Sequence, residues 1–266
     1  TTDETWHVRT GQIRYSEIYM GETIDTNAPD IREGKVSAVP EAVFHPTVLT
    51  PQLNEPVRVT EHLKAKRVFT DSKGNILVDF GQNLTGLVEI RIRGEKGQKI
   101  TVRHAETLDQ DGVFYPDTLR TAKSEDTYIL NGEEQVLMPH FTFHGFRYAA
   151  VEGIENPQPE MFTACVMHSN MRKTGEFRCS NEKVNQLQSN ISWSLRDNFF
   201  DIPSDCPQRD ERLGWTADAQ VFAKAAMYNF DVRRFFSKWL NDLSADQYPN
   251  GTVPYIVPDV LDGSEE

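Results

Sequence analysis

The spacing of the apolar residues changes once along this chain of 266 residues, and that change limits the folds open to it. Before about residue 170, short runs alternate between apolar and polar side chains, which is typical of half-buried strands. From about residue 177, apolar residues recur every three or four positions, which is typical of helices with one buried face. The sequence therefore predicts a β region followed by an α region.

The β region consists of short strands that turn signals separate. Asn131-Gly132 is the strongest local cue for a hairpin, and Gly145 lies inside an aromatic-rich strand, where it would mark a bulge. Short strands at this spacing predict a sandwich. The expected strands cover residues 76–80, 87–93, 99–104, 126–130 and 141–151.

The α region contains three expected helices. Ser180 is expected to cap the first and Asp231 the third, because short polar side chains at these positions accept hydrogen bonds from free backbone N–H groups. Residues 217–229 are rich in alanine and favour the second helix. The expected buried faces are Val184, Leu187, Ile191 and Leu195 in the first helix, and Phe235, Phe236, Trp239, Leu240 and Leu243 in the third. Three helices cannot enclose a core alone.

Residues 203–220 lie between the first two helices and carry an unusual density of charge. Pro203 and Pro207 disfavour a helix there, so the segment is expected to be a loop. Crowded carboxylates differ in their pKa values, which separates acid roles from base roles, and a flat indole suits the apolar face of a sugar. The alternative is a solvated loop of structural ion pairs. The side chains are Asp205, Arg209, Asp210, Glu211, Arg212, Trp215 and Asp218.

The run Asp-Cys-Pro-Gln-Arg-Asp-Glu-Arg-Leu-Gly-Trp-Thr-Ala-Asp-Ala-Gln, residues 205–220, resembles the signature of the bacterial α-L-rhamnosidases of glycoside hydrolase family 78. Residues 79–83 and 144–148 resemble the β-sandwich domain that precedes the catalytic barrel in that family. The resemblance implies a concanavalin-like, jelly-roll type β-sandwich followed by the first helices of an (α/α)6 barrel. It also implies an inverting glycosidase that releases terminal α-L-rhamnose.

The resemblance also implies a division into domains. Residues 1–45, which contain the Tyr-x-Gly-Glu pattern at 19–22, would be the end of an N-terminal β domain, and the proline-rich residues 46–57 a linker. Residues 58–172 would form the sandwich and 173–266 the N-terminal part of the barrel. The chain starts on Thr1 and ends in polar sequence, so we expect both ends to have been cut from a longer protein.

Glu211 occupies the position of the family's general acid. Protonating a glycosidic oxygen near neutral pH requires a raised carboxyl pKa. The neighbouring aspartates would raise it and the arginines would lower it, and the sequence leaves the balance open. The family's general base is a later glutamate, which this chain is expected to lack, so the isolated fragment is expected to be inactive.

The other loop residues have family roles and structural alternatives. Asp205 and Asp218 match carboxylates that bind sugar hydroxyls, although Asp218 also suits the first turn of a helix. Arg209 would pair with a carboxylate or with the ligand, and Trp215 would stack on a sugar or join the core. Asp210 is a further candidate for substrate binding, although some family members lack it.

Composition excludes several other classes of function. A net charge of −12 argues against nucleic acid and membrane partners. Three cysteines without a CxxC pair argue against a zinc site. His104-Ala105-Glu106 matches the H-x-E half of the zinc deaminase motif, but the P-C-x-x-C half is absent, so no metal or cofactor is expected. We expect an α-L-rhamnoside as the ligand and a cytoplasmic location. The rival functions are a non-catalytic carbohydrate-binding β module and a glycosidase of another specificity on the same barrel.

Overall fold

The computed structural model describes residues 5–28, 32–35 and 51–261. The predicted linker at 46–57 therefore lies partly outside the described residues. The strands are β1 (His7–Arg9), β2 (Ile13–Glu17), β3 (Gly21–Asp25), β4 (Arg32–Lys35), β5 (Val57–Lys64), β6 (Arg67–Thr70), β7 (Ile76–Arg93), β8 (Lys99–Ala105), β9 (Glu125–Ile129), β10 (Glu134–Leu137), β11 (His144–Glu152), β12 (Phe162–Ser169), β13 (Phe199–Phe200) and β14 (Ile202–Pro203). The helices are α1 (Glu182–Asn198), α2 (Thr216–Asn229) and α3 (Arg233–Asp246), with two short 3₁₀ turns, η2 (Asp117–Leu119) and η3 (Pro159–Met161).

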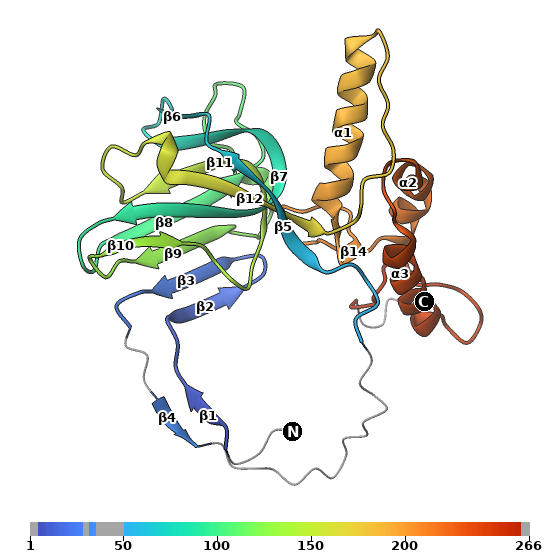
Figure 1. Ribbon diagram of the computed structural model, residues 1–266, viewed down its shortest axis with the longest axis horizontal. Helices are drawn as coiled ribbons and strands as arrows, with labels where there is room; N and C mark the ends of the chain where they lie inside the picture. The colour runs from blue at the N-terminus through green and yellow to red at the C-terminus, as the bar shows by residue number, and fades with distance from the viewer. Residues whose placement is uncertain (1–4, 29–31, 36–50, 262–266) are drawn as a thin grey trace.

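One curled sheet of ten strands makes up most of the β region, whereas β1 pairs with β4 in a separate two-stranded sheet, as Figure 1 shows. Its strand order is β2-β3-β9-β8-β11-β7-β12-β5, with β6 and β10 also paired to β7. The two predicted strands at 76–80 and 87–93 are one strand of 18 residues. The first half of β7 pairs with β6 and β11, and its second half with β12 and β10, so this strand carries the sheet from one layer to the other. The predicted sandwich is confirmed.

The sandwich core forms where the inward-facing side chains of the curled sheet meet. Phe80 and Phe146 pack edge to face with ring centroids 5.6 Å apart. Each large apolar side chain that is fully buried contributes about 1.5–3 kcal/mol to folding, so this cluster is a main source of the domain's stability. Further members with almost no exposed surface are Leu84, Ile90, Ile100, Tyr128, Leu130 and Phe162.

Two local predictions in the sandwich are wrong. Asn131-Gly132 is a turn, with Gly132 at a φ of 96°, but the strands beside it do not pair with each other: β9 pairs with β8, whereas β10 pairs with β7. The register shift in β11 falls between Phe146 and Tyr148 rather than at Gly145. Gly145 is needed for another reason, because a Cβ there would lie 2.7 Å from the Pro207 ring.

Residues 13–25 belong to the same sheet as the sandwich. Strand β3 runs parallel to β9, pairing Thr23 with Thr127, and β2 pairs with β3 at the sheet edge. The sequence places these residues in a preceding domain, but hydrogen bonding makes them an extension of the sandwich, and that brings the turn at Ile18–Met20 to the acidic loop.

The three predicted helices are present, but their caps differ from the prediction. Asn181, not Ser180, caps α1, because its side chain accepts a hydrogen bond of 3.0 Å from the Lys183 backbone. The cap position of α3 is Val232, and the Asp231 carboxylate instead pairs with the Arg233 guanidinium at 2.7 Å. In both cases the prediction missed by one residue.

The helices pack around an aromatic cluster of their own. Phe199 stacks on Phe235 with centroids 4.5 Å apart, and Phe236 and Trp239 complete the group. In the expected stripe of α1, only Leu195 is buried, whereas Val184 and Leu187 are exposed, because nothing among the described residues covers that face. Leu240 in α3 is exposed as well. Among the described residues, none of the helices combines the length and the apolar character that crossing a membrane requires.

Candidate active site

The acidic loop runs between β14 and α2 and is closed at its base by Asp205 and Leu213. The Asp205 backbone N–H donates to the Leu213 carbonyl at 3.0 Å, and the Leu213 N–H donates to the Asp205 carboxylate at 2.9 Å. Because both ends are tied together, the residues between them form a compact projection. This projection rests on the sandwich where Gly145 leaves room for Pro207.

Arg212 anchors the loop to the sandwich from inside. Its guanidinium donates to the carbonyls of Phe143 at 2.7 Å and Ile18 at 3.0 Å, and to the Gln208 and Arg209 carbonyls of the loop itself. Burial lowers the pKa of Arg212 to about 10, so the side chain stays charged at neutral pH. Because its hydrogen-bond partners are carbonyls of the loop and the sandwich, this side chain acts on the shape of the loop.

Arg209 lies between two carboxylates of the loop. Its Nη2 is 2.9 Å from Asp205 and its Nε is 2.8 Å from Glu211. The sequence left open whether this arginine meets a carboxylate or a ligand, and here it bridges two carboxylates. The bridge brings Asp205 and Glu211, six residues apart in sequence, to either side of one cation.

Glu211 is held by donors on both of its oxygens. Oε2 accepts from Arg209 at 2.8 Å and from Arg120 of the sandwich at 2.9 Å, and Oε1 accepts from the Trp215 indole at 3.0 Å. Burial alone would raise the pKa of Glu211, but the two arginines and the indole together hold it below its ordinary value. The sequence left open whether the aspartates or the arginines dominate the pKa of Glu211, and in the structure the donors favour the ionised carboxylate.

Trp215 is neither a core residue nor a free platform. Its ring is half-buried, and its N–H is used by Glu211. Asp210 points to the sandwich, where the Thr121 hydroxyl donates to it, and this hydrogen bond is the main reason why its pKa lies below the usual range. Its second carboxylate oxygen, Oδ1, is buried and accepts no hydrogen bond from the described residues, so it is not exposed to a ligand.

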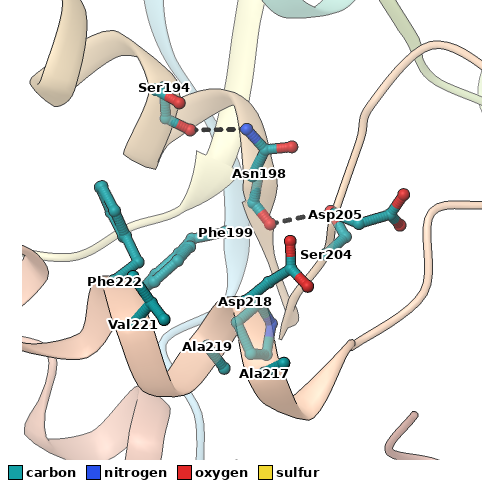
Figure 2. Close-up of a pocket in the computed structure, with 11 residues that line it drawn as sticks. Ser194, Asn198, Phe199, Ser204, Asp205, Ala217, Asp218, Ala219, Val221 and Phe222 are labelled. Carbon is teal, nitrogen blue, oxygen red and sulfur yellow. Dashed lines mark hydrogen bonds between the residues drawn. The ribbon is translucent and has the colours of Figure 1, made fainter. Parts of the chain in front are cut away.

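Asp205 and Asp218 line a cavity of about 420 Å³ between the end of α1 and the start of α2. Figure 2 shows the Asp218 carboxylate pointing toward Ser204 and Asn198, whereas the Asp205 carboxylate points to the other side, where it meets Arg209. Among the described residues, nothing donates a hydrogen bond to the Asp218 side chain, so its oxygens are available to a ligand. Phe199 and Phe222 give the cavity an apolar wall.

Among the described residues, three side chains of the β region hydrogen-bond to Asp210 or Glu211, and they were not predicted as part of the site. They are Arg120 and Thr121, described above, and Tyr19, whose hydroxyl donates to the Glu211 backbone carbonyl at 2.8 Å. Tyr19 opens the Tyr-x-Gly-Glu pattern, whose role the sequence left unexplained. The Glu22 of that pattern is buried and accepts from the backbone N–H groups of His140 and Phe141.

Two groups of described side chains bring potential metal ligands together. His104, Asp126 and His144 are fully buried, but the two imidazoles stack with centroids 4.1 Å apart, and in-plane lone pairs of stacked rings do not converge on one point. Burial lowers the pKa of His104 to about 3, so this half-motif residue is a neutral core group. The second group joins Asp205, Cys206 and Glu211, where Arg209 already occupies the carboxylates.

Both regions of the chain match models of protein families. Residues 69–168 match the bacterial α-L-rhamnosidase concanavalin-like domain, and residues 172–266 match the bacterial α-L-rhamnosidase six-hairpin glycosidase domain. An α-L-rhamnosidase of Formosa agariphila is 43% identical over 98% of the chain, and one of Streptomyces avermitilis is 38% identical over 98%. The chain spans 29% and 26% of the length of these two relatives.

Solved structures show the same similarity. The native rhamnosidase of Aspergillus terreus superposes with a TM-score of 0.91 at 38% identity, over 99% of this chain and 32% of that one. A Streptomyces avermitilis α-L-rhamnosidase complexed with L-rhamnose gives a TM-score of 0.83 at 36% identity, over 94% of this chain and 25% of that one.

Proposed function

The chain belongs to the bacterial α-L-rhamnosidases, glycoside hydrolase family 78, and we propose that it supplies the acid side of a site that hydrolyses terminal α-L-rhamnosides by inversion. One observation carries the proposal: Glu211 is joined through Arg209 to Asp205, which lines the cavity that Asp218 also faces. Because the chain spans about a third of its solved relatives or less, the activity belongs to the whole protein.

In this proposal Glu211 protonates the leaving oxygen. An inverting glycosidase needs a second carboxylate, about 6.5–9.5 Å from the acid, to activate water on the opposite face of the sugar. We place that base outside residues 1–266, on a later hairpin of the barrel. This chain alone would then bind the sugar on one side without hydrolysing it.

The sugar would lie against the cavity lined by Asp205 and Asp218. A carboxylate accepts two hydroxyl donors, so Asp218, whose oxygens are available, suits a vicinal diol. Asp205 and Arg209 would hold a further hydroxyl, and the indole of Trp215 would pack against the ring. Asp210, whose second oxygen is buried, would contribute by holding the loop against Thr121 of the sandwich. In support, a relative at 36% identity has been solved in complex with L-rhamnose.

The test separates acid catalysis from other roles by changing the leaving group. In a protein that carries this chain with a complete barrel, Glu211→Gln should lower the hydrolysis of an alkyl α-L-rhamnoside by about 10²–10⁴-fold. A 2,4-dinitrophenyl rhamnoside needs no protonation to leave, so it should lose far less. Equal losses on both substrates would contradict the role of Glu211 as acid.

The matched control is Glu152→Gln. Glu152 is an exposed glutamate of the sandwich that also pairs with an arginine, Arg103, at 2.6 Å. It should leave both rates unchanged. A whole protein inactive on every α-L-rhamnoside, while folded, would contradict the substrate assignment itself. The cytoplasmic location remains a prediction.

A further inference from the structure

Arg120 reaches the acid from the other domain. It follows the 3₁₀ turn η2 in the connection before β9, and its backbone has a φ of 57°, which an arginine rarely adopts. Its guanidinium lies 2.9 Å from Glu211 Oε2, although the two residues are 91 positions apart. Next to it, Thr121 binds Asp210, so the same connection meets the loop twice.

Glu211 receives donors at both oxygens, and that arrangement conflicts with donating a proton. Two cations share Oε2 and an indole N–H occupies Oε1. A carboxylate surrounded by donors is an acceptor, whereas a general acid has to carry a proton and direct it at the leaving oxygen. At least one donor must therefore move before the chemical step.

The three donors differ in how firmly they are held. Arg209 has 28% of its side chain exposed and is anchored on its far side by Asp205 at 2.9 Å. The Trp215 indole is half-buried and immediately precedes α2. Arg120 has 56% of its side chain exposed, and Glu211 is its only ion-pair partner among the described residues. Arg120 is therefore the donor that can leave at the least cost.

We infer that Arg120 is a positioning residue of the sandwich domain, which holds the Glu211 carboxylate in place until the bound sugar displaces it. The inference rests on the proposed function of Glu211. It assigns a role in the reaction to a domain that otherwise appears only as a scaffold. Release of Arg120 removes one positive charge from Glu211, and the proton affinity of the carboxyl rises as the sugar arrives.

The other charged groups around Glu211 do not cancel the rise in its proton affinity when Arg120 leaves. Arg209, Asp205, Asp210 and Cys206 belong to the same loop, and Arg209 already neutralises Asp205. Tyr19, from the turn between β2 and β3, binds the backbone of Glu211 rather than its carboxylate. Arg120 is thus the cation whose removal changes the charge balance at Oε2 without breaking the loop's internal pairs.

The first experiment needs only this chain. A ¹³C NMR titration should follow the Glu211 carboxyl in the unmodified chain, in Arg120→Gln and in Arg120→Lys. Removing a unit charge at contact distance should raise the pKa by about 0.7 unit, the value for bulk water, and the lysine variant should keep most of the original pKa. The control Arg103→Gln removes an arginine of another ion pair and should change nothing.

The second experiment uses a protein with a complete barrel. The basic limb of the pH profile of kcat/KM reports the pKa of the general acid in the free enzyme. Arg120→Gln should therefore move this limb to higher pH by about 0.7 unit, so that kcat/KM at pH values beyond the limb rises about fivefold. A merely structural role would lower the rate at all pH values without moving the limb. If Arg120→Gln changes neither the pKa of Glu211 nor the position of the basic limb, the inference is overturned. A Glu211→Gln enzyme that keeps full activity overturns the proposed function instead.

Discussion

Replacing the buried Arg212 by methionine tests whether the sandwich shapes the acidic loop. Methionine matches the length of the side chain but donates no hydrogen bond. The guanidinium serves four carbonyls, two from the sandwich and two from the loop. It also lies 4.7 Å from the centroid of the Phe143 ring. The substitution therefore removes four hydrogen bonds, two of which join the loop to the sandwich.

The size of the effect follows from which carbonyls keep a donor. Thr142 still donates to the Ile18 carbonyl at 2.9 Å, and Ser124 to the Gln208 carbonyl at 3.4 Å. The carbonyls of Phe143 and Arg209 lose their donor without such a replacement. At about 1–3 kcal/mol for each buried group left unpaired, the loss is about 3 kcal/mol after methionine regains some apolar packing.

The assay is urea unfolding of the chain together with calorimetry. A loss of about 3 kcal/mol corresponds to a fall in Tm of about 6–12 °C for a chain of this size. The control Arg103→Met removes a partly exposed arginine of the sandwich and should stay within about 0.5 kcal/mol. If Arg212→Met lost less than about 1 kcal/mol, the account of a loop held by this side chain would be refuted.

Three further predictions concern the loop and its surroundings. Gly145→Val should destabilise the chain by about 1–3 kcal/mol, because its Cβ would overlap the Pro207 ring, and urea unfolding measures this loss. The control is Gly11→Val, because a Cβ at Gly11 would meet no neighbouring atom and its backbone is not in the left-handed region. Asp218→Asn should weaken L-rhamnose binding in calorimetric titrations but change unfolding by less than about 1 kcal/mol, because only the helix dipole favours that charge. Arg120→Gln should lower stability at pH 7 by at most about 1 kcal/mol. The difference should shrink in thermal melts as the pH falls below about 4.5, the ordinary pKa of a glutamate, because a carboxyl whose folded-state pKa is lowered loses its contribution to stability on protonation.

The sequence predicted what depends on neighbours along the chain. The change from strands to helices, the loop bounded by Pro203 and the apolar residues of α3 follow local periodicity, which single sequences carry well. The helix caps were missed by one residue each, because Ser180 and Asn181 are both good caps and only the fold decides between them.

Contacts across the fold could not be predicted in the same way. Strand β10 does not pair with β9, its expected hairpin partner, because the second half of the 18-residue β7 provides another edge for it to pair with. Arg120 and Tyr19 meet Glu211 from 91 and 192 residues away. No motif marks Arg120, and the Tyr-x-Gly-Glu pattern that begins at Tyr19 does not indicate which residue Tyr19 contacts. The pKa of Glu211 is lowered mainly by Arg209, then by Trp215 and least by Arg120, and the contacts that these three side chains make with the carboxylate are set by the fold. The sequence could therefore name the opposing charges of the loop but not which of them would dominate.

The structure of a complete enzyme with L-rhamnose bound tests the central claim most directly. The account predicts the sugar between Asp205, Asp218 and Trp215, with Glu211 within hydrogen-bond distance of the anomeric oxygen and Arg120 withdrawn from it. A sugar bound elsewhere, or a Glu211 still held by both arginines beneath a bound sugar, would contradict it.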